Sequence, residues 1–240
     1  MKIDRIRFLI IASLLFTFIK VEAQDSLTHA EKDFKIRKGR FYGSLTFSYD
    51  ARSAENEDQL FRQVVTQNKY NYRIIGNGGY AIKNNMTLGL AAGYGRAEED
   101  ITYLDENNES ITSKSLQQGL AIVPNMRNYI PLGSGQLQVL VQTELSFTFG
   151  ESLQRVFRPE VIDKIEGNFV EIELGVKPGF ILFFDKNWAF ETTVGIAGFS
   201  TRIEETTTNN DRENRQKIVE SGIDLRLNIL QLNLGIAYYF

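Results

Sequence analysis

The sequence predicts an all-β fold, an eight-stranded antiparallel up-and-down transmembrane β-barrel. Three observations predict it. Eight segments alternate apolar and polar residues with a period of two, short turns alternate with long polar connections, and aromatic residues flank aliphatic ones on the apolar faces.

The N-terminus has the pattern of an export signal. A basic segment is followed by the apolar stretch Phe8–Ile19 and then by Val21-Glu22-Ala23. This order is typical of a secretory signal peptide, with cleavage expected after Ala23. The alternative is a membrane anchor, but the apolar run is shorter than the roughly 17–25 residues that span a bilayer as a helix. We therefore expect a signal peptide at 1–23, a short periplasmic N-terminal segment at 24–40 and a barrel domain at 41–240.

Period-two alternation begins at Phe41. In Phe41–Tyr49 the odd positions are Phe, Gly, Leu, Phe and Tyr, and the even positions are Tyr, Ser, Thr and Ser. Most segments are longer than the roughly 5–6 residues of soluble strands, and a tilted membrane strand needs about 9–11 residues within the hydrocarbon. The seven further strands predicted are Lys69–Ile82, Met86–Arg96, Ser115–Ile130, Leu137–Phe149, Phe169–Phe184, Trp188–Ser200 and Gly222–Phe240.

The connections between these strands are of two kinds. Lys83–Asn85, Pro131–Gln136 and Asp185–Asn187 are short and rich in turn-forming residues. Asp50–Asn68, Ala97–Lys114, Gly150–Asn168 and Thr201–Ser221 are long, polar and charged. An even number of strands places all short turns on one side and all long loops on the other, as short periplasmic turns and long extracellular loops.

The last predicted strand changes phase. Its apolar residues are odd-numbered from Ile223 to Ile229 and even-numbered from Leu232 to Phe240. One residue must be absorbed, so we predict a β-bulge near Leu230-Gln231. The alternative is that the earlier stretch is a separate strand, which would give ten strands.

The apolar faces indicate lipid rather than a soluble core. Aromatic residues gather beside the short turns and again beside the long loops, with aliphatic residues between them. Two aromatic belts around an aliphatic band are what a bilayer selects. The belts are Phe41, Tyr80, Phe184, Trp188, Phe190, Tyr238 and Phe240 on the turn side, and Phe47, Tyr49, Tyr70, Tyr72, Tyr94, Phe147, Phe149 and Phe199 on the loop side.

The opposite faces carry charges among glycines, which suits the narrow, side-chain-filled interior of an eight-stranded barrel. We predict a structural charge network, because an unpaired buried charge is strongly disfavoured. The alternative is a proton or ion path. The network residues are Arg73, Arg127, Glu144, Glu171, Glu173, Lys177 and Glu191.

The chain ends on an aromatic strand, with Tyr238 and Phe240 on its apolar face. Such an ending is similar to the C-terminal signal by which outer-membrane barrels are delivered to their assembly machinery. We therefore expect that machinery and outer-membrane lipid as partners.

Two stretches carry a family resemblance. They are Ala121–Pro131, with Pro124 and the Arg127-Asn128-Tyr129 run, and Val176–Gly195, with Pro178-Gly179, a short polar turn, Trp188 and Glu191. They resemble the Bacteroidetes-type outer-membrane β-barrel domain family, relatives in architecture of the OmpA transmembrane domain and the porin family. This sequence has Asn128 where the family pattern commonly has a second aromatic residue. The resemblance implies a Gram-negative outer-membrane barrel and implies no defined activity.

Composition limits the chemistry. The 240 residues include no cysteine and one histidine, His29, and 27 basic residues nearly balance 30 acidic ones. Disulfides, cysteine-ligated zinc and thiol catalysis are excluded, and no global field favours nucleic acid. Outer-membrane lipases and omptin-like proteases need a histidine near the membrane, and His29 precedes the first strand. We expect no catalytic residues, no cofactor and no enzymatic activity.

The predicted outer loops hold two further features. The acidic run Asp105–Glu109, with Glu98, Glu99 and Asp100 nearby, offers hard oxygens for calcium, but it lacks the glycine and spacing of a calcium loop, so we expect no metal site. Apolar residues interrupt these loops at Phe61, Val64, Val65, Val156, Phe157 and Ile162. We expect local packing or short hairpin extensions there, and the alternative is contact with an extracellular partner.

The sequence therefore predicts a non-enzymatic structural or surface-interaction scaffold in the cell outer membrane, with a filled lumen. A narrow passive channel for small solutes or ions is the alternative, and a lipid-modifying enzyme is the third candidate.

Overall fold

The computed structural model describes residues 34–59, 62–105, 108–209, 211, 213, 215–224 and 232–240. The predicted signal peptide, His29, Phe61 and the bulge expected near Leu230-Gln231 lie outside these ranges. Within the described ranges, no helix has the length and apolar character needed to cross a membrane.

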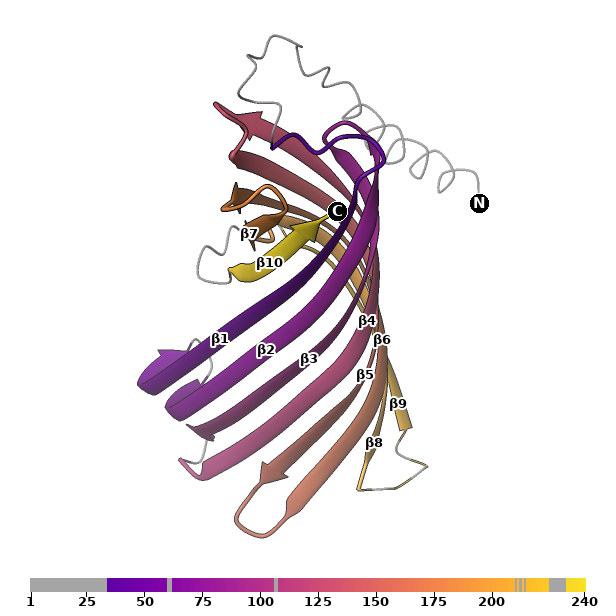
Figure 1. Ribbon diagram of the computed structural model, residues 1–240. Coiled ribbons are helices and arrows are strands. Elements are labelled where there is room, and N and C mark those ends of the chain that lie inside the picture. Colours follow the sequence, from indigo (N-terminus) through magenta and orange to yellow (C-terminus); the bar gives the residue numbers. More distant parts are fainter. Residues whose placement is uncertain are drawn as a thin grey trace. The chain divides into compact units, whose positions relative to one another are not determined.

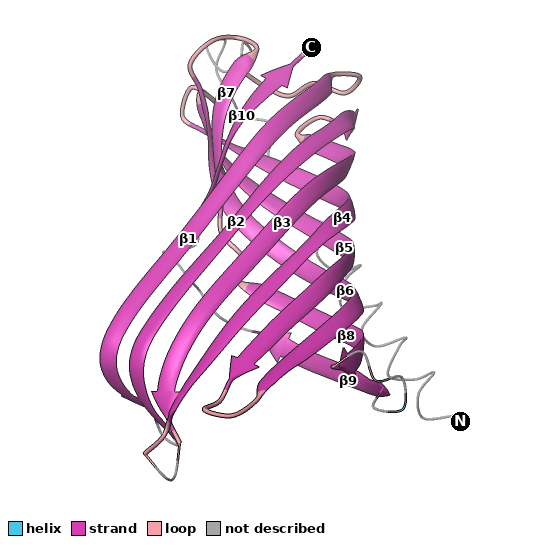
Figure 2. Cartoon of the chain, turned by 90° about the horizontal axis from the view of Figure 1, so that it is seen from below, coloured by secondary structure: helices cyan, strands magenta, loops and turns pink. Residues whose placement is uncertain are grey.

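Long antiparallel strands make up nearly all of the described chain. The elements are β1 (Phe41–Gln59), β2 (Arg62–Lys83), β3 (Met86–Leu104), β4 (Ser110–Leu132), β5 (Leu137–Phe157), β6 (Ile162–Phe183), β7 (Trp188–Thr193), β8 (Ala197–Thr208), β9 (Arg215–Asp224) and β10 (Asn233–Tyr239). Figure 1 shows β1 to β6 side by side in chain order, and Figure 2 shows the common tilt of these strands.

The sheet closes into a ring of eight strands. Each of β1 to β5 pairs with the next strand along the chain, β6 pairs with β7, β7 with β10, and β10 with β1. The first and last strands of the chain thus meet, as the up-and-down topology requires. The predicted eight-stranded antiparallel barrel is confirmed.

The seventh strand position is interrupted, where the sequence predicted one continuous strand. β7 and β8 both pair with β6, and the three residues 194–196 between them lie opposite only Lys177 and Pro178. The extra residue is a β-bulge. Pro178 has no N–H to donate at this point, and its carbonyl accepts the backbone N–H of Val194 (2.9 Å). β9 pairs with β8 and β10 with β7, so these two elements together occupy the eighth position.

The predicted long loops are mostly strand, and this corrects the sequence interpretation. β1 to β6 extend well beyond the apolar segments, and the connections at this end shrink to 60–61, 105–109, 158–161 and 209–214. The extensions pair through backbone hydrogen bonds, which need no apolar alternation. Polar contacts also join the strands, such as the 3.0 Å hydrogen bond between the hydroxyl groups of Thr102 and Thr112. We call this end of the barrel the loop end.

The opposite end, which we call the turn end, carries the short connections that the sequence predicted. β2 and β3 are joined by Asn84 and Asn85, and Asn85 has a φ of 60°. Gly133 and Gly135, with φ of 54° and 80°, lie between β4 and β5. Asparagine and glycine tolerate this left-handed region, which explains their presence in tight turns.

Toward the loop end, the described residues leave part of the ring unpaired. After Phe47, β1 pairs only with β2, and β9 pairs only with β8. Among the described residues, the ring is therefore closed in its turn-end half.

The outward faces are apolar, and the inward faces are polar or small. Large apolar side chains stay exposed around the barrel. The exposed fractions of Leu45, Leu90 and Leu120, for example, are 61%, 59% and 64%. Inward neighbours such as Ala91 and Arg127 are buried. A continuous apolar girdle far exceeds what a water-soluble surface carries and marks a membrane-facing surface.

Candidate functional site: the lumen

An apolar core fills the turn end of the lumen. Its members come from β1, β2, β4, β5, β6, β7, β10 and the segment before β1. Buried side chains in protein interiors are closely packed, so this core fills the barrel at this end. The buried residues are Ile36, Tyr42, Ala81, Tyr129, Leu140, Ile181, Phe183, Ala189, Ala237 and Tyr239, and Phe34 packs against them.

The segment before β1 contributes to this core. The backbone N–H of Asn85 donates to the carbonyl of Ile36 (2.8 Å), and the side chain of Gln138 donates to the carbonyl of Phe34 (2.8 Å). The sequence placed 24–40 as a lead-in before the strands. The structure adds that its described part, 34–40, covers the turn end and inserts Ile36 into it.

Arg40 ties this segment to the C-terminus. Its guanidinium donates to the carbonyl of Tyr239 (3.0 Å), to the carbonyl of Lys186 (2.9 Å) and to the side chain of Asn187 (3.1 Å). Partial burial lowers the pKa of Arg40 from its ordinary value. These contacts hold together the N-terminal segment, the last short turn and the last strand.

A buried ion pair lies next to the apolar core, on its loop-end side. The Arg127 Nη1 is 3.0 Å from Oε1 and 3.1 Å from Oε2 of Glu191, and both side chains are almost fully buried. The Arg127 guanidinium also lies 4.8 Å from the centroid of the Tyr42 ring, and the Tyr239 hydroxyl donates to Glu191 (3.1 Å). The pair is thus surrounded by aromatic rings and satisfied by hydrogen bonds, as a buried ion pair requires.

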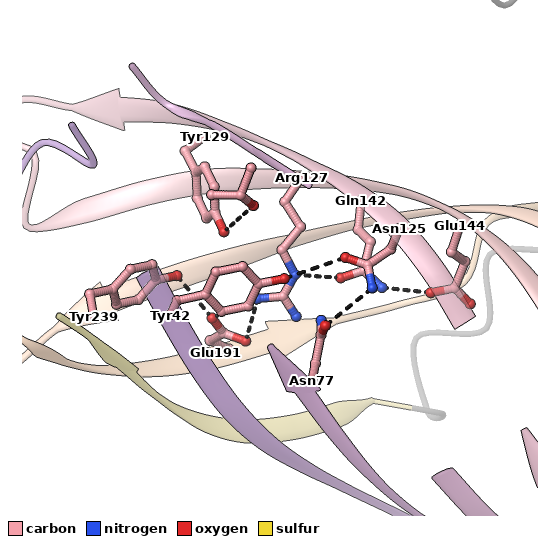
Figure 3. A network of polar contacts seen from close by, with 10 residues as sticks. Tyr42, Asn77, Asn125, Arg127, Tyr129, Gln142, Glu144, Glu191 and Tyr239 are labelled. Carbon is pink, nitrogen blue, oxygen red and sulfur yellow. Dashed lines mark hydrogen bonds and ion pairs between the residues drawn. The ribbon is translucent and has the colours of Figure 1, made fainter. Parts of the chain in front are cut away.

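The ion pair belongs to a continuous polar network (Figure 3). Arg127 Nε donates to Gln142 (2.7 Å), whose amide donates to Glu144 (2.5 Å). Glu144 in turn forms an ion pair with Lys177. A second branch runs from the Tyr42 hydroxyl to Asn125 (3.4 Å), and from the Asn125 amide to Asn77 (3.2 Å).

The seven residues that the sequence named for the interior all line one cavity of about 250 Å³ in the lumen. Four of them, Arg127, Glu191, Glu144 and Lys177, meet in the network just described. Glu171 lies 3.9 Å from Arg202 on β8. Arg73 and Glu173 line the cavity without joining an ion pair among the described residues.

Sequence reasoning missed several lumen residues. Tyr42, Tyr129 and Tyr239 point inward and are buried, whereas the sequence analysis placed them neither in the aromatic belts nor in the interior network. The alternation along the strands could have identified two of them, because Tyr42 and Tyr239 are direct neighbours of the outward Phe41 and Tyr238 and must therefore point inward. The Tyr42 ring occupies space left by glycines, since a Cβ at Gly89 would lie 2.4 Å from its hydroxyl oxygen.

Arg202 was missed for another reason. It lies in a stretch that the sequence assigned to a loop, yet it reaches into the lumen from β8. Its guanidinium lies 3.7 Å from the centroid of the buried Phe169 ring and forms an ion pair with Glu204 at 3.0 Å.

The outward aromatic residues at the turn end form several groups of contacting rings. Ring pairs link Phe41 to Tyr80 (4.8 Å between centroids), Phe184 to Phe190 (4.6 Å) and Trp188 to Tyr238 (4.8 Å). Tyr238 and Phe240, the proposed assembly signal, stack edge to face at 5.0 Å. The Phe240 backbone N–H donates to the carbonyl of Phe41 (2.9 Å), so the last residue is held on the first strand.

The acidic residues near the second loop-end connection are engaged by the protein itself. Asp100 pairs with Lys114 (2.8 Å), Glu98 with Arg96, and Glu99 accepts from Gln67 (2.5 Å). The carboxylate of Asp105 accepts the backbone N–H of Glu109 (2.8 Å), which closes the turn. Among the described residues, no cluster of carboxylates or histidine suits a metal ion.

The apolar residues in the predicted loops mostly belong to the hairpin extensions. Val64 and Val156 are buried on the inward side, whereas Ile162 is exposed. The expected hairpin extensions are therefore present, and they are longer than the sequence indicated.

Comparisons with known proteins add a set of distant structural likenesses. No family model and no curated protein matches the chain. The outer membrane protein OprG from Pseudomonas aeruginosa aligns at 14% identity and a TM-score of 0.37, over 85% of this chain and 97% of that chain. A major outer membrane protein from Thermus thermophilus aligns at 15% identity and 0.37, over 84% and 99%. Neisserial surface protein A (NspA) aligns at 17% identity and 0.32, over 85% and 98%. The strand pairing of the described residues defines the barrel independently of these likenesses.

Proposed function

We propose that this chain is an integral outer-membrane β-barrel that acts as a non-conducting scaffold and presents its hairpin extensions outside the cell. The observation that carries this proposal is the filled turn end of the lumen. Ten buried residues close it, and the Arg127–Glu191 pair lies next to them. A charged or polar solute entering this end would have to displace packed apolar side chains, which is costly.

Location and topology follow from the same features. The exposed aliphatic band between two aromatic belts fits a bilayer, and the short turns fit the periplasmic side. The basic and apolar N-terminus supports export with cleavage after Ala23, outside the described residues. The motifs around Arg127 and Pro178-Gly179 support membership of the Bacteroidetes-type family of Gram-negative barrels.

Partners of this scaffold follow from its surfaces. The outward apolar band would contact outer-membrane lipid, and the aromatic C-terminal strand would engage the barrel-assembly machinery. The hairpin extensions are the surface for an extracellular partner. Catalysis on lipid is disfavoured because the only histidine precedes the barrel.

Electrical recording in planar bilayers tests the scaffold against the channel. The folded protein should give no conductance steps above the lipid leak. A double substitution that empties the core, Tyr42→Ala with Tyr239→Ala, should produce steps, whereas Tyr238→Ala on the outward face should not. Steps from the unmodified protein would support the channel instead, and turnover of radiolabelled lipid would support the enzyme.

A further inference from the structure

The lumen cavity lies on the loop-end side of the Arg127–Glu191 pair. β4 runs from the loop end to the turn end, and the cavity is lined by its earlier residues Gln117 and Gly119 as well as by Arg127. Its two sides differ. β3 and β4 contribute small residues such as Gly93, Gly95 and Ala121, whereas β6 and β8 contribute Glu171, Glu173 and Arg202. The small residues leave the space, and the charged residues give it polarity.

Most charges around this cavity are already neutralised within the protein. Arg127 pairs with Glu191, Lys177 with Glu144, and Arg202 with Glu204 and Glu171. Arg96, at the cavity margin, pairs with Glu98. One cation and one anion remain among the described lining residues. Neither Arg73 nor Glu173 makes an ion pair or a side-chain hydrogen bond with a described residue.

These two residues lie on opposite walls of the barrel. Arg73 is on β2 and Glu173 is on β6, and four steps around the ring of eight separate these strands in either direction. The two side chains therefore start from separate walls, and neither has an ion-pair partner among the described residues, although Arg73 acts electrostatically on Glu171, two residues before Glu173. The carboxylate of Glu173 has room because a Cβ at Gly198 would lie 3.3 Å from its Oε1.

The strand register also places them at the same height. From Ile74, beside Arg73, the ladder pairs lead through β3, β4 and β5 to Val170 on β6. In the other direction they lead through β1, β10 and β7 to Phe180. Because barrel strands are tilted and staggered, the point level with Ile74 lies midway between these two residues. That point is near Gly175, two residues from Glu173.

We propose that the cavity binds a small zwitterion, with its carboxylate at Arg73 and its ammonium group at Glu173. The planar guanidinium suits a carboxylate, because it can donate two parallel hydrogen bonds. A ligand with both charges can form one ion pair with Arg73 and one with Glu173, which have no ion-pair partner among the described residues. The small residues of β3 and β4 accommodate its carbon chain. This inference goes beyond the scaffold and does not depend on whether the barrel conducts.

Isothermal titration calorimetry on the full chain folded in detergent micelles tests the proposal. The probes are ω-amino acids of increasing length: glycine, β-alanine, 4-aminobutyrate and 6-aminohexanoate. Because the charges are held at a set separation, one length should bind best, with a Kd of about 1 mM or lower. Butyrate and n-butylamine, which carry one charge each, should bind the unmodified protein at least about ten-fold more weakly.

Variants identify the two anchors. Arg73→Gln and Glu173→Gln should each weaken binding of the preferred probe at least about ten-fold, and the exchange Arg73→Glu with Glu173→Arg should restore it. Arg155→Gln and Glu151→Gln, both exposed outside the cavity, should bind as the unmodified protein does. Folding of each variant is checked by heat-modifiable migration on a gel. Absence of binding by all four probes would overturn the proposal, and so would single-charge probes or glutamine variants that bind equally well.

Discussion

Buried charged residues in this lumen form ion pairs with each other. Arg127 and Glu191 satisfy each other, and Gln142, Tyr42 and Tyr239 complete their environment. Such an arrangement contributes little net stability compared with apolar packing, but its disruption is costly because one charge remains uncompensated. A variant that removes one partner of a lumen ion pair should therefore lower stability more than a variant that replaces both partners with apolar residues.

Neutralisation of Glu191 should destabilise the barrel strongly. Glu191→Gln leaves Arg127 buried without a countercharge, and we expect the free energy of unfolding to fall by about 3–5 kcal/mol. The double variant Arg127→Met, Glu191→Leu should recover much of this loss because no buried charge remains. Urea unfolding in lipid vesicles measures both, with the exposed Arg155→Gln as control. An unchanged midpoint in Glu191→Gln would show that the pair is not structural.

Gly179 occupies a position where the backbone of β6 approaches β7 closely. A Cβ there would lie 1.9 Å from the carbonyl oxygen of Thr192, so the strands would have to move apart. We expect Gly179→Ala to reduce stability by about 1–3 kcal/mol, a typical cost of overpacking. Gly43→Ala is the matched control, because nothing lies within 4 Å of its added Cβ. Equal unfolding midpoints for the two variants would contradict the close approach.

At the scale of the residue, the sequence named the interior charges but not their partners. Their position on the inward face followed from parity alone. The partner of Arg127 could have been any of four glutamates, because pairing across a lumen depends on how far the strands are staggered. Alternation put Tyr42 on the polar face of its strand, but its contacts with Tyr239 and Arg127 depend on which residues meet across the ring.

Among the elements, the strand limits at the turn end were easier to predict than those at the loop end. The predicted starts at Phe41, Met86, Leu137 and Trp188 agree with β1, β3, β5 and β7. Three of these follow short turns whose Asn, Gly and Asp residues mark a sharp reversal. The loop-end limits were wrong because apolar alternation stops where the strands leave the membrane, while backbone pairing continues. Sequence periodicity reports the environment of the side chains, not the pairing of the backbone.

Hydrogen exchange distinguishes hairpin extensions from mobile loops. We expect the backbone amides of 97–104 and 110–114 that bond across the β3–β4 pair to exchange slowly, because they belong to a regular ladder. A synthetic peptide of residues 97–114, which lacks the rest of the barrel, is the control and should exchange faster. Uniformly rapid exchange over 97–114, as fast as in an unstructured peptide, would show that these residues form the long loop that the sequence indicated.

The whole molecule inverts the arrangement of a soluble barrel. Its large apolar side chains point outward, and its charges point into a narrow lumen that is filled at one end and hollow beyond. The inversion was predictable, because belts and alternation are local patterns. The apolar closure and the cavity were not, because they depend on which residues meet across the ring. Ile36 shows this most clearly, because it belongs to the apolar core but comes from a segment with no strand pattern.

The outward orientation of the apolar faces is the claim on which the rest depends, and a cysteine scan tests it most directly. The chain has no cysteine, so single cysteines can be placed from Met86 to Arg96 on β3 and spin-labelled in lipid vesicles. Labels at Leu88 and Leu90 should be accessible to oxygen dissolved in lipid, and labels at Thr87 and Ala91 should be shielded from it. Oxygen accessibility at Ala91 with shielding at Leu90 would contradict the account.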